Sequence, residues 1–190
     1  AILGAPYPQV HEGMRREHLE AADSHVPFDM PNRKATSTSA IEFRFVHDPT
    51  KGADGKGQPF VPYPKPERTR QPLPFEHFAS DLQERNVLLA KAGQPPVGRA
   101  EFEGCRLYTG PPYLKYNAVL RGKQFAFARD GFEMLCMGNT YATTVHVINS
   151  AIIKLSKLTR TARVYRGVSG GVLPEVCRVP NEFGFTGGAE

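Results

Sequence analysis

Proline is distributed unevenly along this chain of 190 residues, and its positions limit where helices and sheets can form. Of the 17 prolines, 15 lie at or before Pro112. Proline lacks a backbone N–H and fixes φ, so it interrupts helices and is excluded from the middle of sheets. Six prolines fall between Gln58 and Pro74, a density typical of polyproline II or another extended conformation. We therefore expect residues 1–100 to be a proline-rich, largely extended region with one strand and one or two helices, and residues 101–190 to form a separate domain.

Charge and cysteine content restrict the classes of partner and compartment. The 24 Lys and Arg residues against 19 Asp and Glu residues give a formal net charge of +5, without a run of five basic residues. We therefore expect no nucleic-acid interface, and small anions or acidic protein surfaces remain candidate partners. Three widely spaced cysteines indicate neither a disulfide framework nor a zinc site, which favours a reducing compartment such as the cytoplasm or an organelle interior. No run approaches the ~18 apolar residues of a membrane-spanning helix, so no membrane span is expected.

Three histidines recur at intervals of seven residues near the start of the chain: His11, His18 and His25. The segment Glu12–Asp23 is predicted to be a short helix, and one continuous helix would align the three imidazoles on one face. Gly13, together with a proline shortly after His25, argues against a helix that includes all three. We therefore expect solvated histidines and no metal site.

Three further segments have a recognisable pattern. Ile41–His47 alternates apolar and polar residues with period two, which predicts a half-buried strand. Phe78–Gly93 is predicted to be a helix with a capping box in its first turn. Cys105–Thr109 is predicted to be a short strand, and the two prolines that follow it are well placed to start a helix closed by Gly122.

The stretch Thr140–Gly171 contains the densest signals in the chain. Its first half predicts a helix over Tyr141–Leu158, because apolar residues recur at steps of four and three. These residues are Tyr141, Val145, Ile148, Ile152 and Leu155. The next segment, Arg163–Arg166, suits a strand and runs directly into glycines. Arg166 therefore stands where a strand becomes a loop, a position from which a guanidinium can bind a phosphate or carboxylate.

Three segments, in this order, resemble the arginine-specific mono-ADP-ribosyltransferases. Leu107–Gly122 (LYTGPPYLKYNAVLRG) is similar to an early strand and helix of that family, with its tyrosine-threonine-glycine turn. Tyr141–Leu158 looks like the helix that precedes the family's arginine strand, and Val164–Gly171 (VYRGVSGG) is similar to that strand. The resemblance covers roughly the last 85 residues. It implies an α+β fold in which helical segments are followed by the first strands of a two-sheet core, with residues 101–190 as a partial ADP-ribosyltransferase-like domain.

The same resemblance implies that NAD is the cofactor. In the family, the arginine that corresponds to Arg166 holds the diphosphate or the adjoining ribose of NAD, and the glycine that follows, here Gly167, lets the backbone approach. Tyr108 and Ser169 are expected nearby. A planar fork of donors suits a diphosphate, and glycine admits a close contact. The alternative for Arg166 is an ordinary surface arginine at the end of a strand.

We identify no catalytic residue in this chain. The family places a Ser-Thr-Ser-type strand and a Glu-x-Glu loop after the arginine, because an oxocarbenium-like transition state needs a carboxylate beside it. Neither motif follows Arg166, and Glu190 lies about where the serine strand is expected to begin. Residues beyond Glu190, or a second chain, are therefore expected to supply both. Ser37–Ser39 and Glu101–Glu103 have matching letters but precede Arg166, and we interpret them as chance occurrences.

Two functions follow from these observations. The first is the NAD-binding portion of a mono-ADP-ribosyltransferase that transfers ADP-ribose to a side chain of an acceptor protein. The alternative is a non-catalytic scaffold or accessory subunit whose proline-rich half binds along a larger protein assembly. An NAD-induced increase in thermal stability that is lost in Arg166→Ala would favour the first function.

Overall fold

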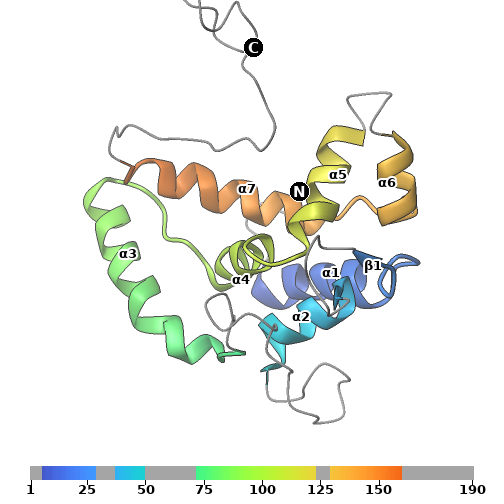
Figure 1. Ribbon diagram of the computed structural model, residues 1–190. Helices are drawn as coiled ribbons and strands as arrows, with labels where there is room; N and C mark the ends of the chain where they lie inside the picture. The colour runs from blue at the N-terminus through green and yellow to red at the C-terminus, as the bar shows by residue number, and fades with distance from the viewer. Residues whose placement is uncertain (1–5, 29–36, 50–71, 123–128, 160–190) are drawn as a thin grey trace, which may run out of the picture. The chain divides into compact units, whose positions relative to one another are not determined.

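The computed structural model describes residues 6–28, 37–49, 72–122 and 129–159, which fold mainly into helices (Figure 1). In chain order the elements are α1 (Tyr7–Leu19), β1 (Pro27–Phe28), β2 (Ser37–Thr38), α2 (Ser39–His47), η3 (Phe75–Phe78), α3 (Ala79–Lys91), α4 (Arg99–Tyr108), α5 (Tyr113–Gly122), α6 (Arg129–Cys136) and α7 (Ala142–Ser156). Within these ranges the strands are limited to β1 and β2, which pair antiparallel. The predicted α+β fold, with the first strands of a two-sheet core, is therefore wrong for the part of the chain that the structure describes.

The chain divides into two compact units, residues 1–159 and residues 160–190, and every described helix belongs to the first. Within this unit α4 packs along α7, and α5 pairs with α6 (Figure 1). The first helix, α1, contacts α2, α4 and α7, whereas α3 packs chiefly against η3. The unit is thus built on helix-to-helix contacts between segments that are distant in the sequence.

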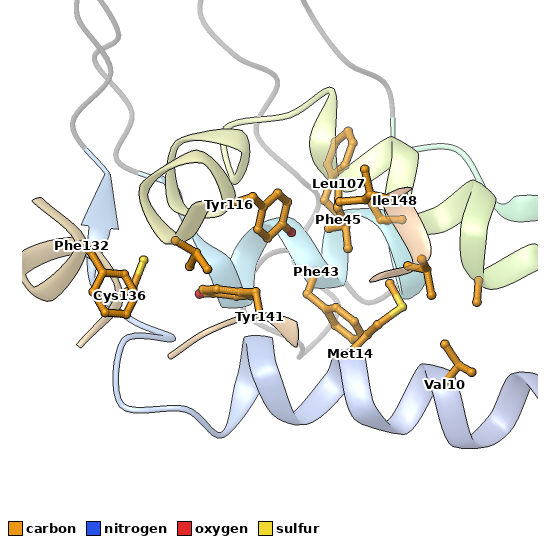
Figure 2. Packing of buried hydrophobic residues seen from close by; sticks show 14 residues of the cluster. Val10, Met14, Phe43, Phe45, Leu107, Tyr116, Phe132, Cys136, Tyr141 and Ile148 are labelled. Carbon is orange, nitrogen blue, oxygen red and sulfur yellow. The ribbon is translucent and has the colours of Figure 1, made fainter. Parts of the chain in front are cut away.

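One hydrophobic core joins helices from both sides of residue 100. Met14 of α1 lies beside Phe43 of α2, and the rings of Tyr116 and Tyr141 lie next to each other (Figure 2). The buried cluster consists of Val10, Met14, Phe43, Phe45, Val46, Ala100, Leu107, Tyr116, Val119, Phe132, Cys136, Tyr141, Val147 and Ile148. Helix α1 confirms, with shifted ends, the helix predicted over residues 12–23, whereas the predicted extended conformation is wrong for α2. Most of the proline-rich segment lies outside the described residues.

Residues 41–47 were predicted to be a strand and instead form most of α2. The Oγ1 atom of Thr38 accepts the N–H of Ile41 at 3.3 Å, which caps the first turn. Glu42 in that turn adds a favourable negative charge at the helix N-terminus. Both the polar Glu42 and the apolar Phe43 are buried, so this helix has no single apolar face. The alternation of apolar and polar residues therefore did not indicate which side chains are buried.

Residues 105–108, predicted to belong to a strand, instead complete α4. The N-terminus of this helix is fixed by Glu101, whose Oε2 accepts the N–H of Gly98 at 2.7 Å. Gly104 allows the helix to approach α7, because a Cβ atom at this position would lie 2.7 Å from Cγ2 of Val147. The strand was predicted from residues 105–109 alone. Neither the Glu101 cap nor the contact of Gly104 with α7 involves these five residues, so the sequence pattern gave no sign of the helix.

Besides α1, three further predicted helices are confirmed, with shifted ends. The prediction for residues 78–93 corresponds to α3, although no side chain caps its first turn as expected. Helix α5 ends at Gly122 as predicted, and α7 lies within the predicted range 141–158. The buried face of α7 differs from the predicted stripe, since Ile152 is 53% exposed while Val147 and Ala151 are buried.

Candidate functional site

Of the four predicted NAD contacts, the structure describes one. Arg166, Gly167 and Ser169 lie outside the described residues. Tyr108 is the last residue of α4, and its side chain is 38% exposed. The ring of Tyr108 is stacked against Tyr116 of α5, with centroids 6.4 Å apart and an angle of 16° between the planes. Tyr108 is therefore a partly exposed aromatic residue at the end of a helix, next to a buried one.

The buried ring of Tyr116 is held in turn by His18 of α1. Its hydroxyl lies 2.8 Å from Nε2 of His18, and Nδ1 of His18 lies 2.7 Å from the carbonyl oxygen of Met14. A carbonyl only accepts hydrogen bonds, so Nδ1 carries the hydrogen and Nε2 accepts from the tyrosine. Burial lowers the pKa of His18 to about 3, which keeps the imidazole neutral at physiological pH. The expectation that this histidine is solvated is therefore wrong.

A second group of buried polar residues, the Asp23 cluster, lies beside this pair and consists of Asp23, Ser39, Lys115, Asn139 and Tyr141. The Asp23 carboxylate accepts from Nζ of Lys115 at 2.8 Å, from the hydroxyl of Tyr141 at 2.6 Å and from Nδ2 of Asn139 at 2.8 Å. Ser39 contacts the same tyrosine hydroxyl at 2.8 Å. Asp23 and Lys115 are fully buried, so the cluster joins the chain after α1 to α5 and α7.

Burial shifts the pKa values of the two titratable donors of this cluster, Lys115 and Tyr141. It lowers the pKa of Lys115, although the neighbouring Asp23 opposes that shift. It also raises the pKa of Tyr141, and the hydrogen bond to Asp23 adds to this effect. A group with no solvent exposure cannot meet a substrate directly. We therefore assign the Asp23 cluster to the stability of the fold.

The Glu103 cluster occupies the other end of α1 and consists of Tyr7, His47, Arg99 and Glu103. The hydroxyl of Tyr7 lies 3.0 Å from Oε2 of Glu103, and Nε of Arg99 lies 2.9 Å from Oε1. Nδ1 of His47 lies 3.1 Å from Oε2, although this contact is not aligned as a hydrogen bond. Burial favours a raised pKa for Glu103, but its positive and hydrogen-bonding neighbours outweigh burial and the pKa is lowered. Glu103 is thus a charged, buried link between α1, α2 and α4.

The two acidic residues of Glu101–Glu103 have separate structural roles. The Glu101 carboxylate accepts hydrogen bonds from Ser150 and from Nζ of Lys154, the latter at 2.8 Å, in addition to the N–H of Gly98. Both acidic residues are buried and face different partners, so they do not form an open pair of carboxylates.

Ser37, Thr38 and Ser39 are likewise occupied by structural contacts. Thr38 caps α2, Ser37 donates to Glu42 at 2.6 Å, and Ser39 belongs to the Asp23 cluster. All three side chains are therefore engaged in contacts within the fold.

The sequence pointed only weakly to the residues that the structure gathers. The seven-residue spacing of His11 and His18 was the one signal, and both residues do lie on α1. The partners Asp23, Lys115 and Tyr141 could not be recognised, because 92 positions separate the first two and 118 separate Asp23 from the tyrosine.

Comparison of the chain with models of protein families, with curated proteins and with solved structures gave no match. Within the described ranges, no three His, Cys, Asp or Glu residues are grouped so that they could hold a metal ion. No helix in the same ranges is long and apolar enough to cross a membrane.

Proposed function

We propose that this chain carries the NAD-binding portion of a mono-ADP-ribosyltransferase that modifies a side chain of an acceptor protein. The observation that carries the proposal is the order of three segments that resemble this family, which end in the Arg166-Gly167 step. Helices α5 and α7 lie within the first two of these segments. At the start of the first segment, residues 107 and 108 end α4 instead of forming the expected strand. The proposal concerns the binding of NAD and assigns no catalytic residue.

Tyr108 has the chemistry expected of an NAD contact. Tyr108 exposes 38% of its side chain, and its ring can stack on an aromatic ring of the cofactor while its hydroxyl donates a hydrogen bond. Arg166 would bind the diphosphate through its fork of N–H groups, Gly167 would admit the cofactor close to the backbone, and Ser169 would offer a hydroxyl. NAD would supply the ADP-ribosyl group and the nicotinamide leaving group.

The carboxylate that stabilises the transition state is not assigned to this chain. Glu101 and Glu103 are engaged in structural contacts, and the glutamates after Arg166 (Glu175, Glu182 and Glu190) do not form a Glu-x-Glu pair. The same observation favours the second candidate, a non-catalytic accessory subunit that binds along a larger protein assembly. The two functions differ in whether the chain binds NAD.

The test is the thermal unfolding of the full chain with and without NAD. A ligand present at 100 times its Kd stabilises the folded state by about 2.7 kcal/mol, which raises Tm by several degrees for a chain of this size. We expect this shift in the wild type and its loss in Arg166→Ala. Arg163→Ala, which removes the same charge three residues earlier, is the control and should retain the shift.

Tyr108 offers a second comparison inside the described structure. Tyr108→Ala should weaken the NAD-induced shift, whereas Tyr113→Ala should leave it unchanged, because Tyr113 is equally exposed at 37% but has no predicted role. Absence of any shift at saturating NAD in the wild type would contradict the proposal and favour the accessory subunit.

A further inference from the structure

The inner face of α1 carries two histidines whose rings lie in a row with residues of α2, two of the contacts stacked and one edge-on. The ring centroids of His11 and His47 are 4.7 Å apart, those of His47 and Phe43 are 4.1 Å apart, and those of Phe43 and His18 are 5.2 Å apart. His11 and His18 are seven residues apart and therefore lie on the same face of the helix. The contact between α1 and α2 thus includes three titratable imidazoles around one phenylalanine.

The hydrogen bonds of His18 in the structure are those of its neutral form. Nδ1 donates to Met14, and Nε2 is the acceptor for the hydroxyl of Tyr116. A proton added to Nε2 would turn this acceptor into a second donor, so the Tyr116 hydroxyl would have to accept from Nε2 instead of donating to it. Both side chains are buried, so the new positive charge would have no access to water.

The charges that face His18 do not compensate a second cation. Asp23 is the carboxylate on this side, and it already accepts from Lys115, Tyr141 and Asn139. Lys115 of α5 is itself a buried ammonium group. From α2, His47 also faces His18 and would repel it if both imidazoles were protonated. Protonation of His18 would therefore place an uncompensated charge inside the core.

The surroundings of His11 are mixed in charge. His47 of α2 and Arg99 of α4 disfavour a proton on His11, whereas Glu103 of α4 and Asp48 after α2 favour one. Glu103 is already engaged by Tyr7, Arg99 and His47. Burial is the largest influence and, with the adjacent His47, lowers the pKa of His11.

We propose that α1 is an acid-sensitive element of this protein: protonation of His11 and His18 below a pH of about 6.5 releases α1 from α2, α4, α5 and α7. At neutral pH both imidazoles are neutral and the helix is docked. In acid the detached state of α1 binds protons more readily than the docked state, because both imidazoles are hydrated when the helix is detached. This mechanism is independent of the proposed binding of NAD.

The direction of the effect follows from linkage. The pKa of His18 is about 3 in the folded state and ~6.5 in a solvated state, so the detached state takes up the proton first as the pH falls. Stability contributed by this histidine is fully present above pH ~6.5 and decreases tenfold in equilibrium constant for each pH unit below it. Between pH 7.5 and 5.0, His18 alone favours detachment by roughly 30-fold, because nearly all of the proton uptake by the detached state falls in this interval. His11 acts in the same direction.

The test is amide hydrogen exchange of the full chain at pH 7.5 and at pH 5.0, with rates corrected for intrinsic exchange. In the wild type the protection of α1 should fall by at least roughly 30-fold more than that of α4 at the lower pH. His18→Gln should remove most of this pH dependence, because glutamine can still donate and accept but does not titrate. His25→Gln is the control, since His25 is exposed, and it should behave as the wild type.

Two results would overturn the proposal. The first is equal protection of α1 at both pH values in the wild type, and the second is an unchanged pH dependence in His18→Gln. If His18→Gln does not fold at pH 7.5, His11→Gln at the half-buried position provides the same comparison with a smaller expected loss. A pH dependence in His11→Gln equal to that of the wild type would then contradict the role of this face of α1.

Discussion

At the scale of single residues, Asp23 has the largest predicted influence on stability. It is fully buried, and three donors from distant parts of the chain converge on its carboxylate. One of these donors is the ammonium group of Lys115, which is also fully buried. Removing one partner of such a pair costs about 3–5 kcal/mol, because the other charge then remains buried without compensation.

We therefore expect Asp23→Asn to lower the free energy of unfolding by about 3–5 kcal/mol at pH 7, measured by urea denaturation. Adding Lys115→Met to Asp23→Asn should restore part of the loss, because the uncompensated cation is then removed. Glu84→Gln at an exposed position in the middle of α3 is the matched control and should change stability by less than about 0.5 kcal/mol. Equal stability of the single and the double variant would contradict this account of the Asp23 cluster.

Tyr141 shows how the same cluster holds an unfavourable backbone conformation. Its φ of 46° and ψ of 36° are left-handed, which costs roughly 1–2 kcal/mol for a residue other than glycine. The hydroxyl contacts of Tyr141 with Asp23 and Ser39 fix the side chain in this position directly before α7. The strain is thus offset by contacts that come from two other parts of the chain.

For His11 and His18, the sequence indicated the shared helix face but not the burial. The sequence placed His11 and His18 on a common face if a helix continued through Gly13, and the structure contains that helix. Gly13 does not end the helix. It allows a close contact with α7, because a Cβ atom at this position would lie 2.9 Å from Oγ1 of Thr143. The burial of His18 could not be predicted, since its partner Tyr116 is 98 positions away.

At the scale of helices, the distance of closest approach between α4 and α7 is set by Gly104. Alanine is intrinsically better than glycine in a helix by about 1 kcal/mol. At Gly104, however, the added methyl group would meet Cγ2 of Val147 at 2.7 Å, and Ile148 lies just behind it. Both of these side chains are buried and cannot move into solvent.

Gly104→Ala should therefore destabilise the protein by about 1–3 kcal/mol, whereas Gly131→Ala in α6 should stabilise it by up to about 1 kcal/mol. Gly131 is the matched control because nothing lies within 4 Å of the position of its Cβ atom. Both variants can be compared by urea denaturation. Val147→Ala combined with Gly104→Ala should recover part of the loss. Stabilisation by Gly104→Ala alone would show that the two helices do not constrain each other.

Local pattern predicted some helices and failed for others, for physical reasons. Helices α5 and α7 were recognised because each combines a start or end signal with apolar residues at helical spacing. Helix α2 was missed because it is buried on several sides, so its apolar and polar residues do not separate by period. Helix α4 was missed because Gly104, which is unfavourable in an isolated helix, is required by the contact with α7. These helices are specified by tertiary contacts more than by local preference.

At the scale of the whole described structure, stability is expected to be distributed unevenly. Helices α4, α5 and α7 each bury several side chains and share the core with α1 and α2. In α3 only Leu89 is buried, and Val87 and Leu88 are 44% and 40% exposed. Two local attachments hold α3: its preceding turn η3 packs against Phe102 of α4, and Asn86 bonds the backbone of Val97.

We expect the amides of α3 to exchange by local opening at pH 7.5, with a lower free energy than those of α4 and α7, because opening α3 exposes little apolar surface. Asn86→Ala removes two hydrogen bonds to Val97, of 2.8 and 3.0 Å, and should lower the opening free energy of α3 by about 1–2 kcal/mol. Gln83→Ala at an exposed position of the same helix is the control and should have little effect. In both variants the protection of α7 should stay as in the wild type. Exchange of α3 at the same free energy as α7, with both lowered together by Asn86→Ala, would instead mean that the described helices open as one cooperative unit.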